Sequence, residues 1–147
     1  MINIELVKDG VAPKLMSEGA SGYDVFAREI FYSGENKATI HLGFKIDTTQ
    51  GFEDAAALGT AAFLIPRSGW GTKFGVALMN TIGLIDMDYR GEVILKIKWD
   101  KKPTELCRGA RVGQMVLVPC LTEELNIIAK LSDTERGEGG FGSTGSE

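Results

Sequence analysis

Histidine and cysteine, which form most protein zinc sites, are scarce in this sequence of 147 residues. Its single histidine, His41, excludes a site built from several histidines and argues against a serine–histidine catalytic triad. The two cysteines, Cys107 and Cys120, lack the paired spacing of a zinc site or a disulfide framework. We therefore expect two reduced thiols and a chemistry that depends on other residue types.

Long apolar runs and an excess of positive charge are also missing. No segment approaches the ~20 apolar residues of a membrane-spanning helix. The first ten residues include acidic side chains and no apolar signal-peptide core, which predicts a cytoplasmic protein with no membrane partner. The net charge of −4 argues against a protein that binds nucleic acid directly. A small anionic ligand held by a few local arginines is compatible with this charge.

Short segments with strand periodicity dominate the sequence. Residues 38–47 and 92–99 alternate apolar and polar side chains, which predicts half-buried strands and places His41 on the solvent face. Residues 61–66 and 113–120 are short apolar runs bounded by turn residues. This pattern favours a single all-β domain, a closed sandwich or barrel.

Helical segments are few. A short helix is expected after Ser68, and residues 52–58 have the composition of one or two helical turns. Residues 121–131 fit either a helix or a strand, because their apolar spacing and their β-branched content conflict.

Two aspartates, Asp86 and Asp88, lie in DMDYRG between two apolar segments, where we expect the turn of a β-hairpin. Aspartate commonly occupies turns, and this alone explains both residues. A rigidly held turn aspartate beside a ligand is also a good general base at neutral pH. On these residues alone, both interpretations stay open.

Arg67 and Ser68 precede the expected helix in PRSGWGTKFG, which satisfies no phosphate-loop pattern. Free N–H groups at a helix start attract anions, so the pair fits a phosphate contact. An N-cap serine beside a surface arginine explains the same residues.

Near the end of the sequence, GEGGFG matches the dinucleotide fingerprint through Gly137, Gly139 and Gly142. That fingerprint needs a following helix, and the five residues after Gly142 are too few to form one. Two interpretations of this segment remain: a loose tail, or a flap that closes on a phosphate.

Taken together, these segments resemble the homotrimeric dUTPase family, the deoxyuridine 5′-triphosphate nucleotidohydrolases. Five family motifs occur in family order across residues 20–145: ASGYDVFA, PRSGWGTKFGV, NTIGLIDMDYRGEV, RGARVGQMVLVP and RGEGGFGSTG. The resemblance implies an all-β jelly roll or distorted barrel over residues 1–135 with one short helix. Residues 136–147 would form a flexible C-terminal arm that closes over a neighbouring subunit's active site in a homotrimer.

The resemblance further implies hydrolysis of dUTP to dUMP and pyrophosphate. This reaction would limit uracil incorporation into DNA and supply dUMP for thymidylate synthesis. Asp86 would be the general base that activates water for attack on the α-phosphorus. Mg²⁺ would be held chiefly by the three phosphates, and Asp24 would contact it through water or have a structural role.

The resemblance also assigns the substrate contacts. Uracil would lie in the hairpin between Asn80 and Tyr89, with Phe141 of the arm stacked on it. Tyr89 would pack beneath the deoxyribose and exclude a 2′-hydroxyl. The residues that match the family's substrate-binding positions are Arg67, Ser68, Gly69, Asn80, Gly83, Tyr89, Gln114, Arg136, Phe141, Gly142, Ser143 and Thr144.

Three features depart from the family pattern, one of them the segment KWDKKPTEL, which replaces an asparagine that frequently follows the third motif's strand. Trp70 stands where the family usually has a smaller residue, and residues 49–62 form a longer segment that could bind a protein regulator. Two other functions are considered: a dCTP deaminase of the same superfamily, and a regulatory nucleotide-binding module without catalysis. The GLIDMDYRG segment favours the dUTPase form over the deaminase.

Overall fold

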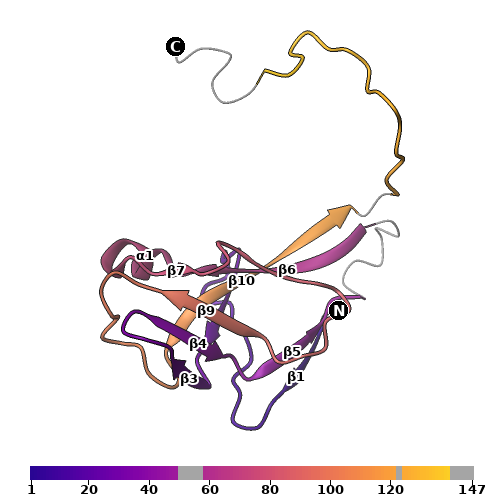
Figure 1. The fold of residues 1–147 in the computed structure, drawn as a ribbon. Coiled ribbons are helices and arrows are strands. Elements are labelled where there is room, and N and C mark those ends of the chain that lie inside the picture. Colours follow the sequence, from indigo (N-terminus) through magenta and orange to yellow (C-terminus); the bar gives the residue numbers. More distant parts are fainter. Residues whose placement is uncertain (50–57, 122–123, 140–147) are drawn as a thin grey trace.

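Antiparallel strands account for almost all of the regular structure (Figure 1). The computed structural model describes residues 1–49, 58–121 and 124–139. Within these ranges the elements are β1 Asn3–Leu6, β2 Tyr23–Phe26, β3 Glu29–Tyr32, β4 Lys37–His41, β5 Phe44–Asp47, β6 Leu58–Pro66, α1 Ser68–Phe74, β7 Ala77–Leu78, β8 Gly83–Ile85, β9 Ile94–Lys98 and β10 Arg111–Leu121. The predicted all-β fold with one short helix is confirmed.

The strands form three antiparallel sheets. Two sheets have four strands each, in the orders β2-β10-β6-β8 and β3-β4-β9-β7, and β1 pairs with β5 in the third. The longest pairing joins β6 to β10, from Pro66 opposite Gly113 to Leu58 opposite Leu121. Each four-stranded sheet has two edge strands, so the described sheets do not close into a barrel.

The core contains the apolar faces that the alternation predicted. Ile40 on β4, Phe44 on β5 and Ile97 on β9 are completely buried, whereas Lys96 and Lys98 point to solvent. Burial of each large apolar side chain stabilises the fold by about 1.5–3 kcal/mol.

The prediction of one continuous strand over residues 38–47 is wrong in one respect. Gly43 has a φ of 78°, which lies in the left-handed region, and a Cβ there would meet the Gly10 backbone. The chain therefore bends between β4 and β5, and β5 pairs with β1 in a separate sheet. The position of His41 also differs, because its half-buried ring bonds to Glu92 instead of facing solvent freely.

The predicted hairpin around DMDYRG is also wrong. β8 pairs with β6 and β9 pairs with β4 and β7, so residues 86–93 cross from one sheet to the other. Each flanking segment is apolar enough to join either sheet, and the sequence pattern contains no information about the partner strand.

The helix after Ser68 is confirmed, although it is short. α1 ends at Phe74, its C-cap Gly75 has a φ of 65°, and the chain continues into β7. None of the helices in the described ranges is long and apolar enough to cross a membrane. Residues 124–139 form no helix or strand and run away from the sheets in Figure 1. The expected turns over residues 52–58 fall almost wholly outside the described residues.

Candidate active site

Asp24 is a buried carboxylate, and both of its oxygens accept hydrogen bonds from other side chains. It lies on β2 opposite Gln114 of β10, and it is 4% exposed. The Gln114 amide Nε2 donates to Asp24 Oδ1 at 3.0 Å, and Arg111 Nη1 donates to Oδ2 at 3.1 Å. The carboxylate therefore holds a predicted phosphate-binding residue, Gln114, in one orientation.

Arg67 joins this arrangement from the end of β6. Its Nη1 donates to the backbone oxygen of Arg111 at 3.1 Å. Arg67 is the N-cap of α1 and Ser68 its first residue, so the N-cap interpretation of Ser68 is wrong by one position. We call Asp24, Arg67, Arg111 and Gln114 the β10 cluster; Ser68 and Gly69 follow it, exposed, at the start of α1.

A second group of predicted residues surrounds a cavity of about 340 Å³ between the two four-stranded sheets. A volume of this size is typical of a small-ligand site. Asn80 and Gly83 line it, and the other lining residues are Leu64, Leu78, Met79, Leu84, Ile85, Ile94, Leu95 and Lys96. A Cβ on Gly83 would come within 3.0 Å of the Leu64 side chain, so this position favours glycine.

Asp86 follows β8 directly and begins a turn. The Tyr89 backbone N–H donates to the Asp86 carbonyl oxygen at 3.2 Å, and the Asp86 side chain is exposed. The Tyr89 hydroxyl donates to the Glu92 carbonyl oxygen at 3.1 Å, and its ring lies where a side chain on Gly91 would be. Asn80, Gly83, Asp86 and Tyr89 are called the β8 cluster below.

Arg90 anchors this turn and was not among the predicted site residues. Its Nη1 donates to the Met87 carbonyl oxygen at 2.7 Å and its Nη2 to Asp47 Oδ1 at 3.0 Å. Hydrogen bonds from Thr49, with a smaller contribution from Arg90, lower the pKa of Asp47. The signal in the sequence was the arginine inside DMDYRG, which has no apolar or turn-forming role.

Glu92 anchors the other end of the crossing loop and was also missed. Its carboxylate accepts hydrogen bonds from Arg28 Nε at 2.9 Å and the Gly43 N–H at 2.9 Å, and it pairs with His41 Nδ1 at 2.9 Å. Burial alone would raise the pKa of Glu92, but these partners outweigh it and lower the pKa to about 2. The group is therefore ionised at neutral pH.

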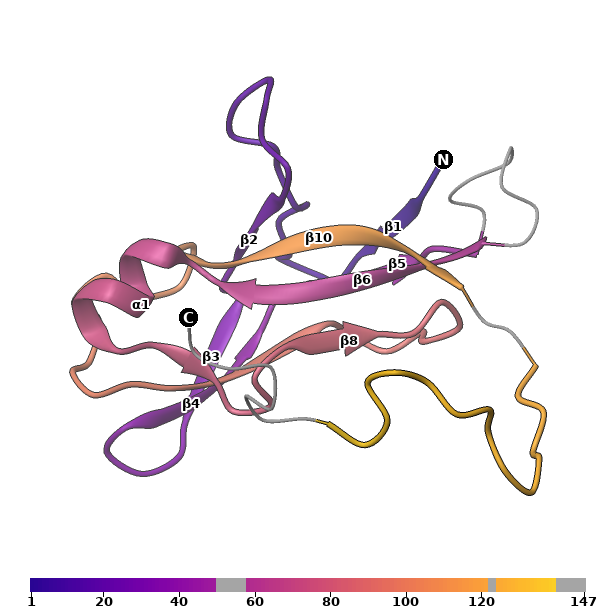
Figure 2. The same ribbon diagram turned by 90° about the horizontal axis from the view of Figure 1, so that it is seen from above.

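The two clusters lie apart within one chain. Ile85 lies opposite Ala62 on β6, and Arg67 is five residues further along. Asp86 is one residue further away than Ile85, so at about 3.3 Å per residue it is separated from Arg67 by roughly 20 Å along the sheet. Figure 2 shows the same arrangement, with α1 and the loop after β8 near opposite ends of β6.

The predicted arm is described only at its beginning. Arg136 is exposed, and its Nε donates to the Gly139 carbonyl oxygen at 3.0 Å. The remaining predicted arm residues lie outside the described residues: Phe141, Gly142, Ser143 and Thr144.

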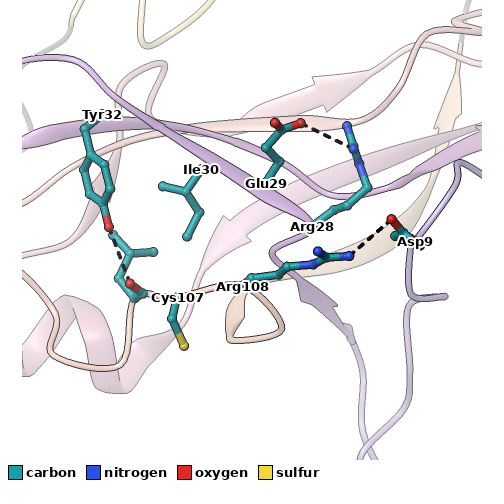
Figure 3. A pocket seen from close by; sticks show the side chains of 8 residues that line it. Asp9, Arg28, Glu29, Ile30, Tyr32, Cys107 and Arg108 are labelled. Atoms are coloured by element: carbon teal, nitrogen blue, oxygen red, sulfur yellow. Dashed lines mark hydrogen bonds and ion pairs between the residues drawn. The ribbon is translucent and has the colours of Figure 1, made fainter.

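Another cavity, of about 570 Å³, is lined by none of the predicted site residues (Figure 3). Its two arginines are already ion-paired, Arg108 with Asp9 at 3.4 Å and Arg28 with Glu29 at 3.3 Å. Paired arginines of this kind are poorly suited to bind a triphosphate, so we place the candidate site at the two clusters.

The described residues contain no group of three or more histidine, cysteine, aspartate or glutamate side chains that could hold a metal ion. A metal that is bound mainly by substrate phosphates fits this donor set better than one bound by the protein.

Comparison with known proteins gives a consistent result. A model of the dUTPase family matches residues 8–145. The deoxyuridine 5′-triphosphate nucleotidohydrolase of Beijerinckia indica is 39% identical over 144 residues, covering 93% of this chain and 85% of that protein. The corresponding protein of Bdellovibrio bacteriovorus is 39% identical over 140 residues, covering 92% of this chain and 89% of that one.

Solved structures agree in fold. The dUTPase of Staphylococcus bacteriophage 80alpha, solved with dUpNHpp, has a TM-score of 0.79 at 26% identity and covers 99% of each chain. A mutant dUTPase from phage phi11 of S. aureus, described with a structural Mg(II) ion, has a TM-score of 0.72 at 19% identity. It covers 90% of this chain and 99% of its own.

Proposed function

The chain belongs to the dUTPase family and is a dUTP nucleotidohydrolase, and we propose that it cleaves dUTP to dUMP and pyrophosphate with Asp86 as the general base. The observation that carries this proposal is the position of Asp86. It directly follows β8, whose three residues line the cavity between the sheets, so a base would stand beside a bound nucleoside.

The reaction is a displacement at the α-phosphorus. The Asp86 carboxylate takes a proton from water, and the water oxygen forms a bond to the α-phosphorus. The bond from that phosphorus to the bridging oxygen breaks, and its electron pair leaves with pyrophosphate. The protein supplies position and charge, as phosphoryl transfer requires, and no protein nucleophile is needed.

Selection of deoxyuridine belongs to the β8 cluster. Backbone N–H and C=O groups between Asn80 and Tyr89, together with the Asn80 amide, read the pairing edge of uracil, and cytosine would leave these groups mismatched. The Tyr89 ring packs beneath the deoxyribose and excludes a 2′-hydroxyl. Its bond to the Glu92 carbonyl oxygen and the absence of a side chain at Gly91 hold the ring in place, which supports this role.

Recognition of the triphosphate belongs to the β10 cluster and to the arm. Arg67 and Gln114 are oriented by Arg111 and Asp24, as a binding site requires. Phe141 stacks on the uracil. The other proposed phosphate contacts are Ser68, Gly69, Arg136, Gly142, Ser143 and Thr144.

We further infer that the active site is shared in a homotrimer. The base and the phosphate-binding arginine are roughly 20 Å apart along one sheet, and this separation supports the inference. Two copies that bring the β8 cluster of one subunit to the β10 cluster of another would complete the site. The arm, residues 136–147, extends from the domain of residues 1–135 to close over it.

Mg²⁺ is the proposed cofactor, and when bound it neutralises charge on the phosphates. Asp24 bonds directly to the proposed phosphate contact Gln114, and it would reach the ion only through water, since both of its oxygens have protein partners. We place the reaction in the cytoplasm, where it limits uracil incorporation into DNA and supplies dUMP for thymidylate synthesis. A protein regulator would bind residues 49–62, of which 50–57 lie outside the described residues.

The direct test is pyrophosphate release with Mg²⁺ from dUTP, dCTP, dTTP and UTP, with the products identified. We expect release from dUTP alone. Formation of ammonia and dUTP from dCTP would instead assign deaminase activity, and no product from any of the four would favour a nucleotide-binding module.

A further inference from the structure

Trp70 lies within α1 beside the β10 cluster, and its contacts indicate a role. The side chain is buried, with 3% of its surface exposed, inside the short helix α1. Its indole Nε1 donates to Glu105 Oε2 at 3.0 Å. Because Glu105 lies on the loop between β9 and β10, this bond holds the ring in one orientation.

Arg67 lies against the same ring. Its guanidinium carbon is 5.8 Å from the centroid of the Trp70 ring, within the range of a cation–π contact. The bond from Arg67 Nη1 to the Arg111 carbonyl oxygen holds the guanidinium at a second point. Arginine has five N–H donors, and this bond uses one of them.

The guanidinium also borders open space. Arg67, Trp70 and Arg111 all line a cavity of about 720 Å³. A phosphate chain that approaches from this cavity would meet an arginine already oriented by an aromatic face and a carbonyl oxygen.

We propose that Trp70 is a positioning residue for triphosphate binding, because its ring pre-orients the Arg67 guanidinium. The inference rests on the proposed function, in which Arg67 binds phosphate. A free arginine loses side-chain entropy when it binds, and a ring that limits its rotamers beforehand reduces that loss. A smaller residue at this position would leave Arg67 less ordered.

The test compares the affinity of Mg²⁺–dUpNHpp for variants of the full chain by calorimetry. Trp70→Leu should raise the Kd about fivefold, the size of a partly exposed cation–π contact, and Trp70→Phe should stay within about twofold of wild type. Trp99→Leu is the matched control, because Trp99 is also 3% exposed and lies outside the cavity. It should keep the wild-type Kd despite a similar loss of core packing.

Glu105→Ala tests the same role of Trp70 in case the tryptophan variants misfold. Glu105 is exposed, so the core remains intact, and release of the indole should weaken binding about twofold. Trp70→Leu should add no further loss in an Arg67→Met background, because the two residues act as one unit.

The outcomes separate this inference from the proposed function. If Arg67→Met binds the analogue as tightly as wild type, the phosphate role of Arg67 is wrong, and the role of Trp70 with it. If Arg67→Met weakens binding but Trp70→Leu does not, only the positioning role is wrong. If Trp70→Leu and Trp99→Leu lose the same affinity for the analogue, Trp70 contributes only core packing.

Discussion

Asp86 and Glu92 stand near the two ends of the crossing loop, and their surroundings differ. The backbone oxygen of Asp86 accepts the hydrogen bond that forms the turn. Its side chain takes no part in that bond and is exposed to solvent. Glu92 is enclosed by Arg28, His41 and the Gly43 N–H. The first is suited to accept a proton from water, and the second holds the loop to the rest of the fold.

The proposed base is tested by Asp86→Asn. The amide keeps the size of the side chain but cannot take a proton, so kcat should fall by about 100-fold or more while dUpNHpp still binds. Single-turnover hydrolysis and calorimetry on the same preparation measure both. Asp88→Asn, two residues away and also exposed, should behave as wild type. A near-normal rate for Asp86→Asn would remove it as the base.

Glu92 should give the fold an acid-sensitive stability. Its pKa falls from 4.5 to about 2 on folding, so the unfolded chain binds the proton more readily. The resulting stabilisation, on the order of 3 kcal/mol, is complete above pH ~4.5 and is lost as pH falls toward ~2. Urea unfolding at fixed protein concentration across this range measures it.

Two variants test whether Glu92 causes the loss of stability at low pH. Glu92→Gln should be less stable at pH 7 and should lose most of the pH dependence between ~4.5 and ~2. Glu35→Gln, at an exposed position in the turn between β3 and β4, should retain it. An unchanged slope in Glu92→Gln would show that other carboxyl groups cause the acid sensitivity.

At the scale of elements, the crossing loop of residues 86–93 connects the two sheets and carries the proposed base. Met87 packs against Gly59 at the start of β6, and Arg90 ties the loop to Asp47 on β5. The loop is therefore held by contacts to two other strands, although it contains no regular structure itself.

Loss of the Arg90 anchor should affect turnover more than folding. Arg90→Met removes bonds to Met87, Tyr89 and Asp47, and a base displaced by even ~1 Å can lose up to ~100-fold in rate. The change in unfolding free energy should stay near 1 kcal/mol, because the Arg90 side chain is half exposed. Lys45→Met, which removes the ion pair with Glu5 at the surface, should keep the wild-type rate. Equal rates for both variants would contradict the anchoring role.

The arm is the second element with a proposed role. The described contacts of Arg136 and Gly137 lie within residues 134–139, so the described part of the arm adds little to the packed core. Deletion of residues 136–147 should leave the unfolding midpoint unchanged and reduce dUTP hydrolysis strongly. A truncated chain that fails to fold would show that the arm is structural.

At the scale of the whole molecule, the shared site predicts complementation between inactive variants. Chains with Asp86→Asn and chains with Arg67→Met should each be poorly active alone. In a mixed trimer isolated with two different tags, one of the three sites combines an intact Asp86 with an intact Arg67. Such trimers should recover about one third of the wild-type rate.

The opposite result has a clear meaning. If Asp86 and Arg67 of one chain formed the same site, every site in the mixture would contain one of the substitutions. The mixed preparation would then show only the residual activity of its parents, and the separation of the two clusters would have another explanation.

The elements and apolar faces were well predicted from sequence, and the contacts between distant segments were not. Ile40 and Leu95 could be assigned to the core because alternation is a local property of the strand. Gly43 divided a predicted strand, because a glycine shows where a bend is permitted but not that it occurs. Glu92 and Arg90 were missed because their partners, Arg28 and Asp47, are distant in sequence.

By itself the sequence determined the all-β class, the single short helix, the family and the residue types of the proposed chemistry, since periodicity and motif order can be read along one chain. Only the tertiary structure decided that β8 and β9 belong to different sheets and that Asp24 binds Gln114 and Arg111. It also decided that Asp86 follows the residue opposite Ala62, whereas Arg67 follows the end of β6. Strand pairing depends on the packing of all segments at once, and therefore no local pattern contains it.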